Sequence, residues 1–165
     1  GLHIPLVYNT SGYEFVEVLK QLDGIISVYL ADLRYASNQS AKEFSLTGDY
    51  VEKARLAIKE MYRQVDNLVL DDNEIAVKGL IVRLLVLPNG LAGTEESLRW
   101  IAAELSPEVT VSIMSQYLPM YRAAIRVRRP WKAPHAWNKS TTLTAHGSQL
   151  KAVVNDVHEV IAVGY

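Results

Sequence analysis

Apolar residues in this chain fall in short blocks whose spacing alternates between two patterns. Ile25 to Ala31 is a nearly continuous apolar run, as expected for a strand buried on both faces. The block before it has helical spacing, with apolar residues at Phe15, Val18, Leu19 and Leu22. Strand, helix and strand thus fit within about 30 residues, the usual size of a βαβ unit.

The same alternation continues toward the C-terminus. Strands are predicted near residues 2–8, 25–31, 80–87 and 109–114. A helix is predicted after Asp49, which with Glu52 resembles a capping box, and another from Thr94 to Pro107. The predicted fold class is therefore α/β, with four parallel strands in sequential order and helices covering the sheet.

Outside these segments the spacing of apolar residues is less regular. The polar segment after Tyr35 is assigned no element, and Asp71 to Asn73 is expected to mark a loop or the end of a helix. Residues 118–142 show no clear period and contain three prolines, which indicates loop. A last helix is predicted from the apolar residues Leu150, Val153, Val154, Val157 and Ile161.

Composition narrows the class of protein. A chain of 165 residues with 49% apolar and 21% charged residues is typical of one soluble globular domain. It has no apolar run near the roughly 20 residues that span a bilayer and no basic-then-apolar N-terminal signal, so a cytoplasmic protein without membrane contact is expected. The absence of cysteine excludes disulfides, thiolate metal sites and a cysteine nucleophile.

Charge is distributed unevenly along the chain. Residues 1–108 hold 16 acids and 10 bases, net −6, whereas residues 109–165 hold 2 acids and 7 bases, net +5. Basic residues interleaved with tryptophans can bind nucleic acid. The bases of residues 120–139 are expected instead to be solvated or to pack against acidic surface of the same protein.

Candidate chemistry lies where the second strand ends. Asp32 and Arg34 are two residues apart, so both side chains would address one space at the carboxyl edge of the sheet, where parallel sheets bind ligands. Taken alone, the pair is more simply a surface salt bridge. Arg83, inside an apolar strand, must either pair with a carboxylate such as that of Asp32 or contact a ligand; both alternatives stay open.

Common catalytic and nucleotide-binding signatures are absent. The chain contains no GxGxxG, GxxxxGK[ST], GxSxG or HExxH motif. Its four histidines, at positions 3, 135, 146 and 158, lack metal-ligand spacing, so no metal ligand is predicted.

Six segments between residues 1 and 119 carry a family resemblance. They are, in order, IPLVYNTSGYE (4–14), LDGIISVYLADLRY (22–35), EMYRQV (60–65), GLIVRLLVLPNGLAGT (79–94), ELSP (104–107) and MSQYLP (114–119). Together they resemble the radical S-adenosylmethionine (SAM) proteins of the pyruvate formate-lyase activating enzyme-like family.

The resemblance implies a fold and a division of the chain. Residues 1–119 would form the C-terminal half of a TIM-barrel-like β/α barrel, and residues 120–165 a basic loop and a C-terminal helix. The family's CxxxCxxC loop, which binds a 4Fe-4S cluster, is absent, so the cluster half of the barrel is expected to be missing. The family's Asp-x-Lys pair appears as Asp32 and Arg34, while Ala31 and Leu84 replace a usual proline and histidine.

The resemblance also implies cofactors, partners and site residues. SAM would be the cofactor, with no ligand here for the 4Fe-4S cluster of this oxidoreductase family. The implied partners are the missing N-terminal half-barrel and a protein substrate such as a glycyl-radical enzyme. The SAM side of the barrel would be lined by Asn9, Thr10, Ser11, Asp32, Arg34, Arg83, Gln116 and Tyr117.

Two hypotheses about function follow. In the first, the chain is the SAM-side half of a radical SAM enzyme and is inactive without the cluster half. In the second, it is a non-catalytic fragment or split subunit that binds a partner, or a second copy of itself, through the exposed edge of strand 2–8.

Overall fold

The computed structural model describes residues 4–115, 117, 140–145 and 148–155. Its helices are α1 (Val16–Gln21), α2 (Asn38–Ser45), α3 (Tyr50–Val65) and α4 (Thr94–Glu104), with a 3-10 turn, η1, at Pro88–Gly90. Its strands are β1 (Val7–Thr10), β2 (Val28–Asp32), β3 (Val69–Leu70), β4 (Ala76–Leu85), β5 (Thr110–Met114), β6 (Ser140–Ala145) and β7 (Ser148–Asn155). Among the described helices, none is long and apolar enough to cross a membrane.

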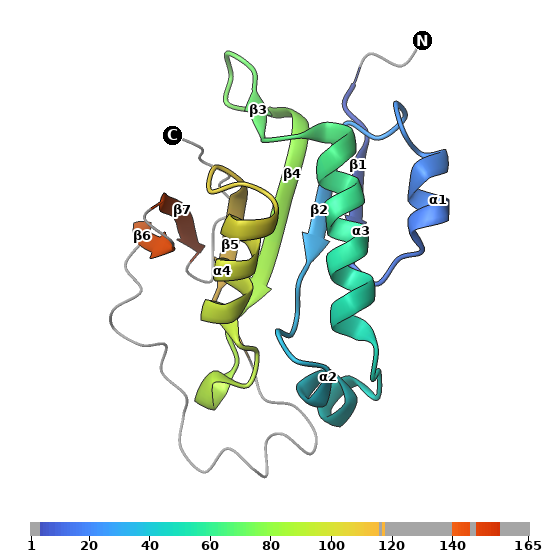
Figure 1. The fold of residues 1–165 in the computed structure, drawn as a ribbon. Helices are drawn as coiled ribbons and strands as arrows, with labels where there is room; N and C mark the ends of the chain where they lie inside the picture. The colour runs from blue at the N-terminus through green and yellow to red at the C-terminus, as the bar shows by residue number, and fades with distance from the viewer. Residues whose placement is uncertain (1–3, 116, 118–139, 146–147, 156–165) are drawn as a thin grey trace.

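The strands form a sheet in the order β1-β2-β4-β5-β7-β6, with β3 paired antiparallel to β4 (Figure 1). Neighbours from β1 to β5 are parallel and follow one another in sequence, apart from the short β3. The predicted α/β fold class is therefore confirmed: β1, β2, β4 and β5 are the four predicted parallel strands, with flanking helices, an arrangement compatible with a partial β/α barrel.

One face of this sheet packs against α3 and α4, which lie side by side in front of the strands (Figure 1). Alternate strand residues point to that face and, with apolar helix residues, form the core: Leu19, Tyr29, Ala31, Ala54, Ile58, Met61, Leu80, Val82, Leu84, Leu98, Ile101, Val111 and Ile113. The residues between them point to the opposite face. There the pairing places Asp32 beside Arg83, and Arg83 beside Ser112.

The predicted last helix is wrong where the structure describes it. Residues 148–155 form β7, which lies parallel to β5, and residues 140–145 form β6 instead of the loop expected up to 142. Leu150, Val153 and Val154 fit helical spacing, but β-branched residues favour a strand when a sheet edge is available for pairing. The remaining members of that helix, Val157 and Ile161, and the basic segment 120–139 lie outside the described residues.

Other differences are local. The polar segment after Tyr35 forms α2, whose cap is Ser37: its hydroxyl accepts a hydrogen bond from the Ser40 amide. The capping box expected before α3 does not form. Asp49 instead accepts from the Tyr13 hydroxyl and pairs with Lys53, while Glu52 accepts from Asn38.

Candidate functional site at the carboxyl ends of the strands

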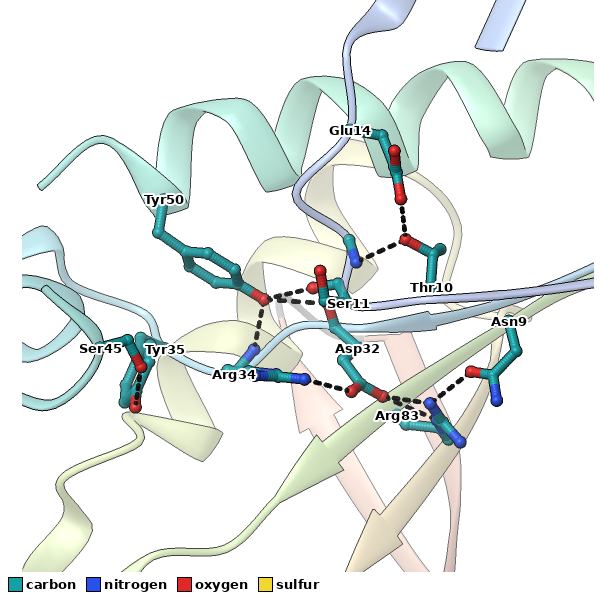
Figure 2. Close-up of polar contacts among 11 residues, drawn as sticks. Asn9, Thr10, Ser11, Glu14, Asp32, Arg34, Tyr35, Ser45, Tyr50 and Arg83 are labelled. Atoms are coloured by element: carbon teal, nitrogen blue, oxygen red, sulfur yellow. Dashed lines mark hydrogen bonds and ion pairs between the residues drawn. The ribbon is translucent and has the colours of Figure 1, made fainter. Parts of the chain in front are cut away.

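Three strand ends meet in a set of polar side chains, Asn9, Asp32, Arg34 and Arg83, called here the carboxyl-edge cluster (Figure 2). Nε and Nη2 of Arg83 each lie 2.7 Å from Oδ1 of Asp32. Nη2 also donates to Oδ1 of Asn9 at 2.7 Å. Arg83 on β4 therefore joins the end of β1 to the end of β2.

Burial differs sharply within the cluster. The side chains of Arg83 and Asp32 are 23% and 17% exposed, whereas that of Arg34 is 51% exposed. Arg34 meets Oδ2 of Asp32 at 3.4 Å, which is long for a charged hydrogen bond. The Asp32–Arg83 pair is thus short and mostly buried, while Arg34 is half-exposed and only loosely paired with Oδ2 of Asp32. With two guanidinium groups and one carboxylate, the cluster has a net charge of +1.

The turn after β1 is fitted closely against the end of β2. Gly12 has a φ of 78°, and a Cβ there would lie 2.3 Å from the carbonyl oxygen of Asp32. The Gly12 amide donates to the Thr10 hydroxyl, which in turn donates to Glu14. Glycine is required because a side chain would collide with the backbone and would disfavour the left-handed conformation.

Tyr50, the first residue of α3, is a member of this site that the sequence did not indicate. Its hydroxyl lies 2.9 Å from the Ser11 carbonyl and 3.1 Å from the Asp32 carbonyl, and accepts from the Arg34 amide at 3.1 Å (Figure 2). The ring is buried, with Tyr13 stacked on it and Tyr35 packed edge-on. Burial raises the pKa of Tyr50 to about 12, so its hydroxyl stays protonated at neutral pH.

The structure brings together only part of the set expected to line the site. Asn9, Asp32, Arg34 and Arg83 are in direct contact. Thr10 is buried and turns to Glu14, and Ser11 contributes its backbone carbonyl. Tyr117 is partly buried beyond the end of β5, and Gln116 lies outside the described residues.

The donor set suits an organic ligand better than a metal. Carboxylate Oδ2 of Asp32 can accept from an ammonium group, and the guanidinium of Arg34 can donate to a carboxylate or phosphate. Within the described residues, no group of three or more histidines and acids could hold a metal ion. A 4Fe-4S cluster does not fit this chain, because iron–sulfur clusters need thiolate ligands and the sequence contains no cysteine.

The chain is similar to uncharacterized protein MJ0674 of Methanocaldococcus jannaschii, with 33% identity over 122 residues. The matched region is 73% of this chain but 32% of the relative, so the chain spans about a third of the relative's length. No protein-family model matches the sequence, and no solved structure matches it. The relative's name states no activity.

Proposed function

We propose that this chain forms the SAM-binding side of a radical SAM enzyme that resembles the activating enzymes of glycyl-radical enzymes. The observation that carries the proposal is the carboxyl-edge cluster, in which a half-exposed arginine and a paired aspartate lie at the end of β2. Ligands of parallel α/β folds bind at this edge. The segments quoted above that resemble the family supply the choice of SAM.

Each member of the cluster has a distinct role in this proposal. Arg34 binds the carboxylate of SAM, because its guanidinium is accessible and only loosely paired. Oδ2 of Asp32 accepts from the ammonium group or faces the sulfonium. Arg83 holds the Asp32 carboxylate in place through a contact at 2.7 Å, and Asn9 in turn accepts a hydrogen bond from Arg83 at 2.7 Å. SAM, when bound to a reducing cluster, supplies the radical chemistry of this family.

The cluster-binding thiolates must come from another polypeptide segment, since this chain has none. The cluster half-barrel is accordingly proposed as a partner, and a glycyl-radical enzyme or another protein as the substrate. This chain by itself is proposed to bind SAM weakly, with a dissociation constant of roughly 0.1–1 mM, because SAM lacks its iron anchor.

Titration of the ¹⁵N-labelled chain with SAM tests the proposal. We expect amide shifts concentrated at Asp32 to Tyr35 and at Asn9, together with shifts of the Arg34 and Arg83 side-chain signals. Arg34→Ala should weaken binding about tenfold, the effect of one charged hydrogen-bonded contact. Arg99→Ala is the matched control, because Arg99 is 63% exposed, pairs with Glu95 and lies on α4 away from the cluster. Absent shifts, or shifts at the amino ends of the strands, would contradict the proposal.

Anaerobic reconstitution with iron and sulfide tests the cluster part separately. After addition of SAM and a reductant, we expect neither stoichiometric cluster absorbance nor release of deoxyadenosine from this chain alone, because it lacks soft sulfur ligands. Stoichiometric absorbance together with deoxyadenosine would show that the ligand argument is wrong.

A second candidate function is that of a non-catalytic interaction module. Among the described strands, β1 is one of the two ends of the sheet and pairs with β2 alone. Apolar side chains on and just before β1 are exposed, including Ile4 at 69% and Val7 at 59%. An apolar edge strand is a ready surface for pairing with another chain.

Size-exclusion chromatography with light scattering tests this second candidate on the purified chain. A module of this kind would self-associate through β1, and Val7→Lys would restore the monomer because a charged edge residue opposes pairing. Leu56→Lys is the control, since Leu56 is 58% exposed but lies on α3. A wild-type chain that stays monomeric at high concentration would count against the module.

A further inference from the structure

We infer that Tyr50 is a positioning residue that sets the ligand-binding geometry of Asp32 and Arg34. The inference deepens the proposed function and rests on it for its binding readout. Tyr50 lies on α3, on the face of the sheet opposite to the carboxyl-edge cluster, and acts through the backbone of β1 and β2 rather than by touching the ligand.

The argument begins with the three backbone groups that share one hydroxyl. The Ser11 and Asp32 carbonyls share its single proton, and the Arg34 amide donates to its oxygen, at 2.9–3.1 Å. These groups belong to the ends of two neighbouring strands, beyond the last residues paired between them. No ladder pairing joins β1 to β2 at this point, so the hydroxyl adds a link between their backbones at the functional edge, beside the link that the Arg83 side chain makes between Asn9 and Asp32.

The same two residues connect the Tyr50 contact to the carboxyl-edge cluster. Asp32 and Arg34 have backbone groups on the Tyr50 hydroxyl, and their side chains are the two members of the cluster that would meet the ligand. A shift of either backbone group changes where Oδ2 and the guanidinium point. Displacements of about 1 Å in a binding constellation are enough to weaken it substantially.

The surroundings of Tyr50 indicate that it is held rigidly. Its ring lies between Tyr13, stacked at 5.9 Å, and Tyr35, edge-on at 5.8 Å. The hydroxyl of Tyr35 is bonded in turn to Ser45 on α2 at 2.9 Å. The loop after β2 is also tied to the loop after η1, where the Ala36 amide donates to the Ala92 carbonyl at 2.9 Å. The ring of Tyr50 and the loop after β2 are therefore both held by contacts with other segments, and the Tyr50 hydroxyl is bonded to the end of β2.

Substitution of tyrosine by phenylalanine at two positions tests the inference. Tyr50→Phe removes the shared hydroxyl but keeps the packed ring. Tyr29→Phe is the matched control: Tyr29 is fully buried on β2, and its hydroxyl donates to Gln64 at 2.7 Å, at the amino end of the strand. Each variant loses one buried hydroxyl, but only the first loses it at the cluster.

Two measurements on each full-length variant are needed. We expect Tyr50→Phe to weaken SAM binding about 5- to 10-fold and Tyr29→Phe to change it less than about twofold. In the absence of ligand, Tyr50→Phe should speed hydrogen exchange of the Arg34 amide about tenfold, whereas Tyr29→Phe should leave it unchanged.

The ligand-free measurement separates this inference from the proposed function. Faster exchange at Arg34 in a chain whose wild type does not bind SAM would support the positioning role and overturn the SAM assignment. Equal losses of stability in the two variants, with unchanged Arg34 exchange and unchanged affinity in Tyr50→Phe, would overturn the positioning role itself.

Discussion

Two polar clusters lie at opposite ends of β2, and they are built differently. At the amino end, a set called here the amino-end cluster joins α1, α3 and β2 through Asp23, Tyr29, Glu60, Arg63 and Gln64. At the carboxyl end, the carboxyl-edge cluster joins β1, β2 and β4. Both contain arginine–carboxylate pairs, so charge alone does not distinguish them.

Accessibility and completeness of pairing do distinguish them. In the amino-end cluster, the buried Glu60 receives two bonds from Arg63 and one from Gln64, and Gln64 also bonds Tyr29 and the Leu19 carbonyl. Its carboxylate is fully engaged by the protein. Within the part of the chain that the structure describes, Oδ2 of Asp32 in the carboxyl-edge cluster has only the 3.4 Å contact of a half-exposed arginine. The first cluster holds helices to the sheet, and the second has bonding capacity left for a ligand.

Replacing glycine by alanine at two positions compares the two ends of β2 directly. One of these substitutions, Gly12→Ala, should have the largest effect on stability. Gly12 and Gly24 both have a φ of 78°, but a Cβ at Gly12 meets the Asp32 carbonyl whereas one at Gly24 meets nothing within 4 Å. We expect Gly12→Ala to lower the free energy of unfolding by about 3 kcal/mol and Gly24→Ala by about 1 kcal/mol. Urea denaturation measures both, and equal losses would mean that the turn after β1 does not press on β2.

Glu60→Gln should have the next largest effect. We expect it to lower the free energy of unfolding by about 2 kcal/mol at neutral pH, because Arg63 loses its charged partner. The bonds from Arg63 lower the pKa of Glu60 to about 2 from the usual 4.5, so its ionised form stabilises the fold. That stabilisation is complete above pH 4.5 and is lost as the pH falls toward 2.

Urea midpoints between pH 7 and pH 2 check the sign of this effect. The difference between wild type and Glu60→Gln should shrink below pH 4.5 and approach zero near pH 2. Asp32→Asn serves as the comparison at the other cluster. A difference for Glu60→Gln that stays constant down to pH 2 would show that the carboxylate charge does not stabilise the fold.

Arg83→Leu should cost less stability, about 1 kcal/mol, because the charge of Asp32 keeps Arg34 as a partner and the Asp32 side chain is still partly exposed to water. Its effect on SAM binding should be larger, about tenfold, because Asp32 loses the contacts that orient it. Calorimetric SAM titration and urea denaturation of the same preparation give the two values. A variant that unfolds readily but binds normally when folded would assign Arg83 a purely structural role.

Arg34→Ala should have the smallest effect on stability, below about 0.5 kcal/mol, since a half-exposed pair at 3.4 Å contributes little. Thermal denaturation measures this change in stability, with Arg99→Ala, an exposed residue on α4, as the control. A loss of stability near that of Glu60→Gln would mean that Arg34 belongs to the structural framework and is not kept available for a ligand.

The amino-acid sequence by itself determined the order of the main elements. Apolar runs such as that of β2 and the helical spacing of α3 depend on neighbours in the chain, so strands, helices and parallel topology could be predicted. The position of Arg83 within an apolar strand also required a partner, and Asp32 was among the alternatives. In the structure Arg83 does pair with Asp32, at 2.7 Å.

Tertiary structure decided what depends on contacts between distant segments. The spacing of Leu150, Val153 and Val154 suits a helix, but pairing with β5 makes β7 a strand. Tyr50 joins backbone groups 39 and 18 residues away, and no local pattern marks a residue for such a role. Gly12 is required because the turn after β1 touches the Asp32 carbonyl and holds a left-handed conformation. Local patterns fix secondary structure because they act along the chain, whereas the geometry of a site is fixed by segments that meet only after folding.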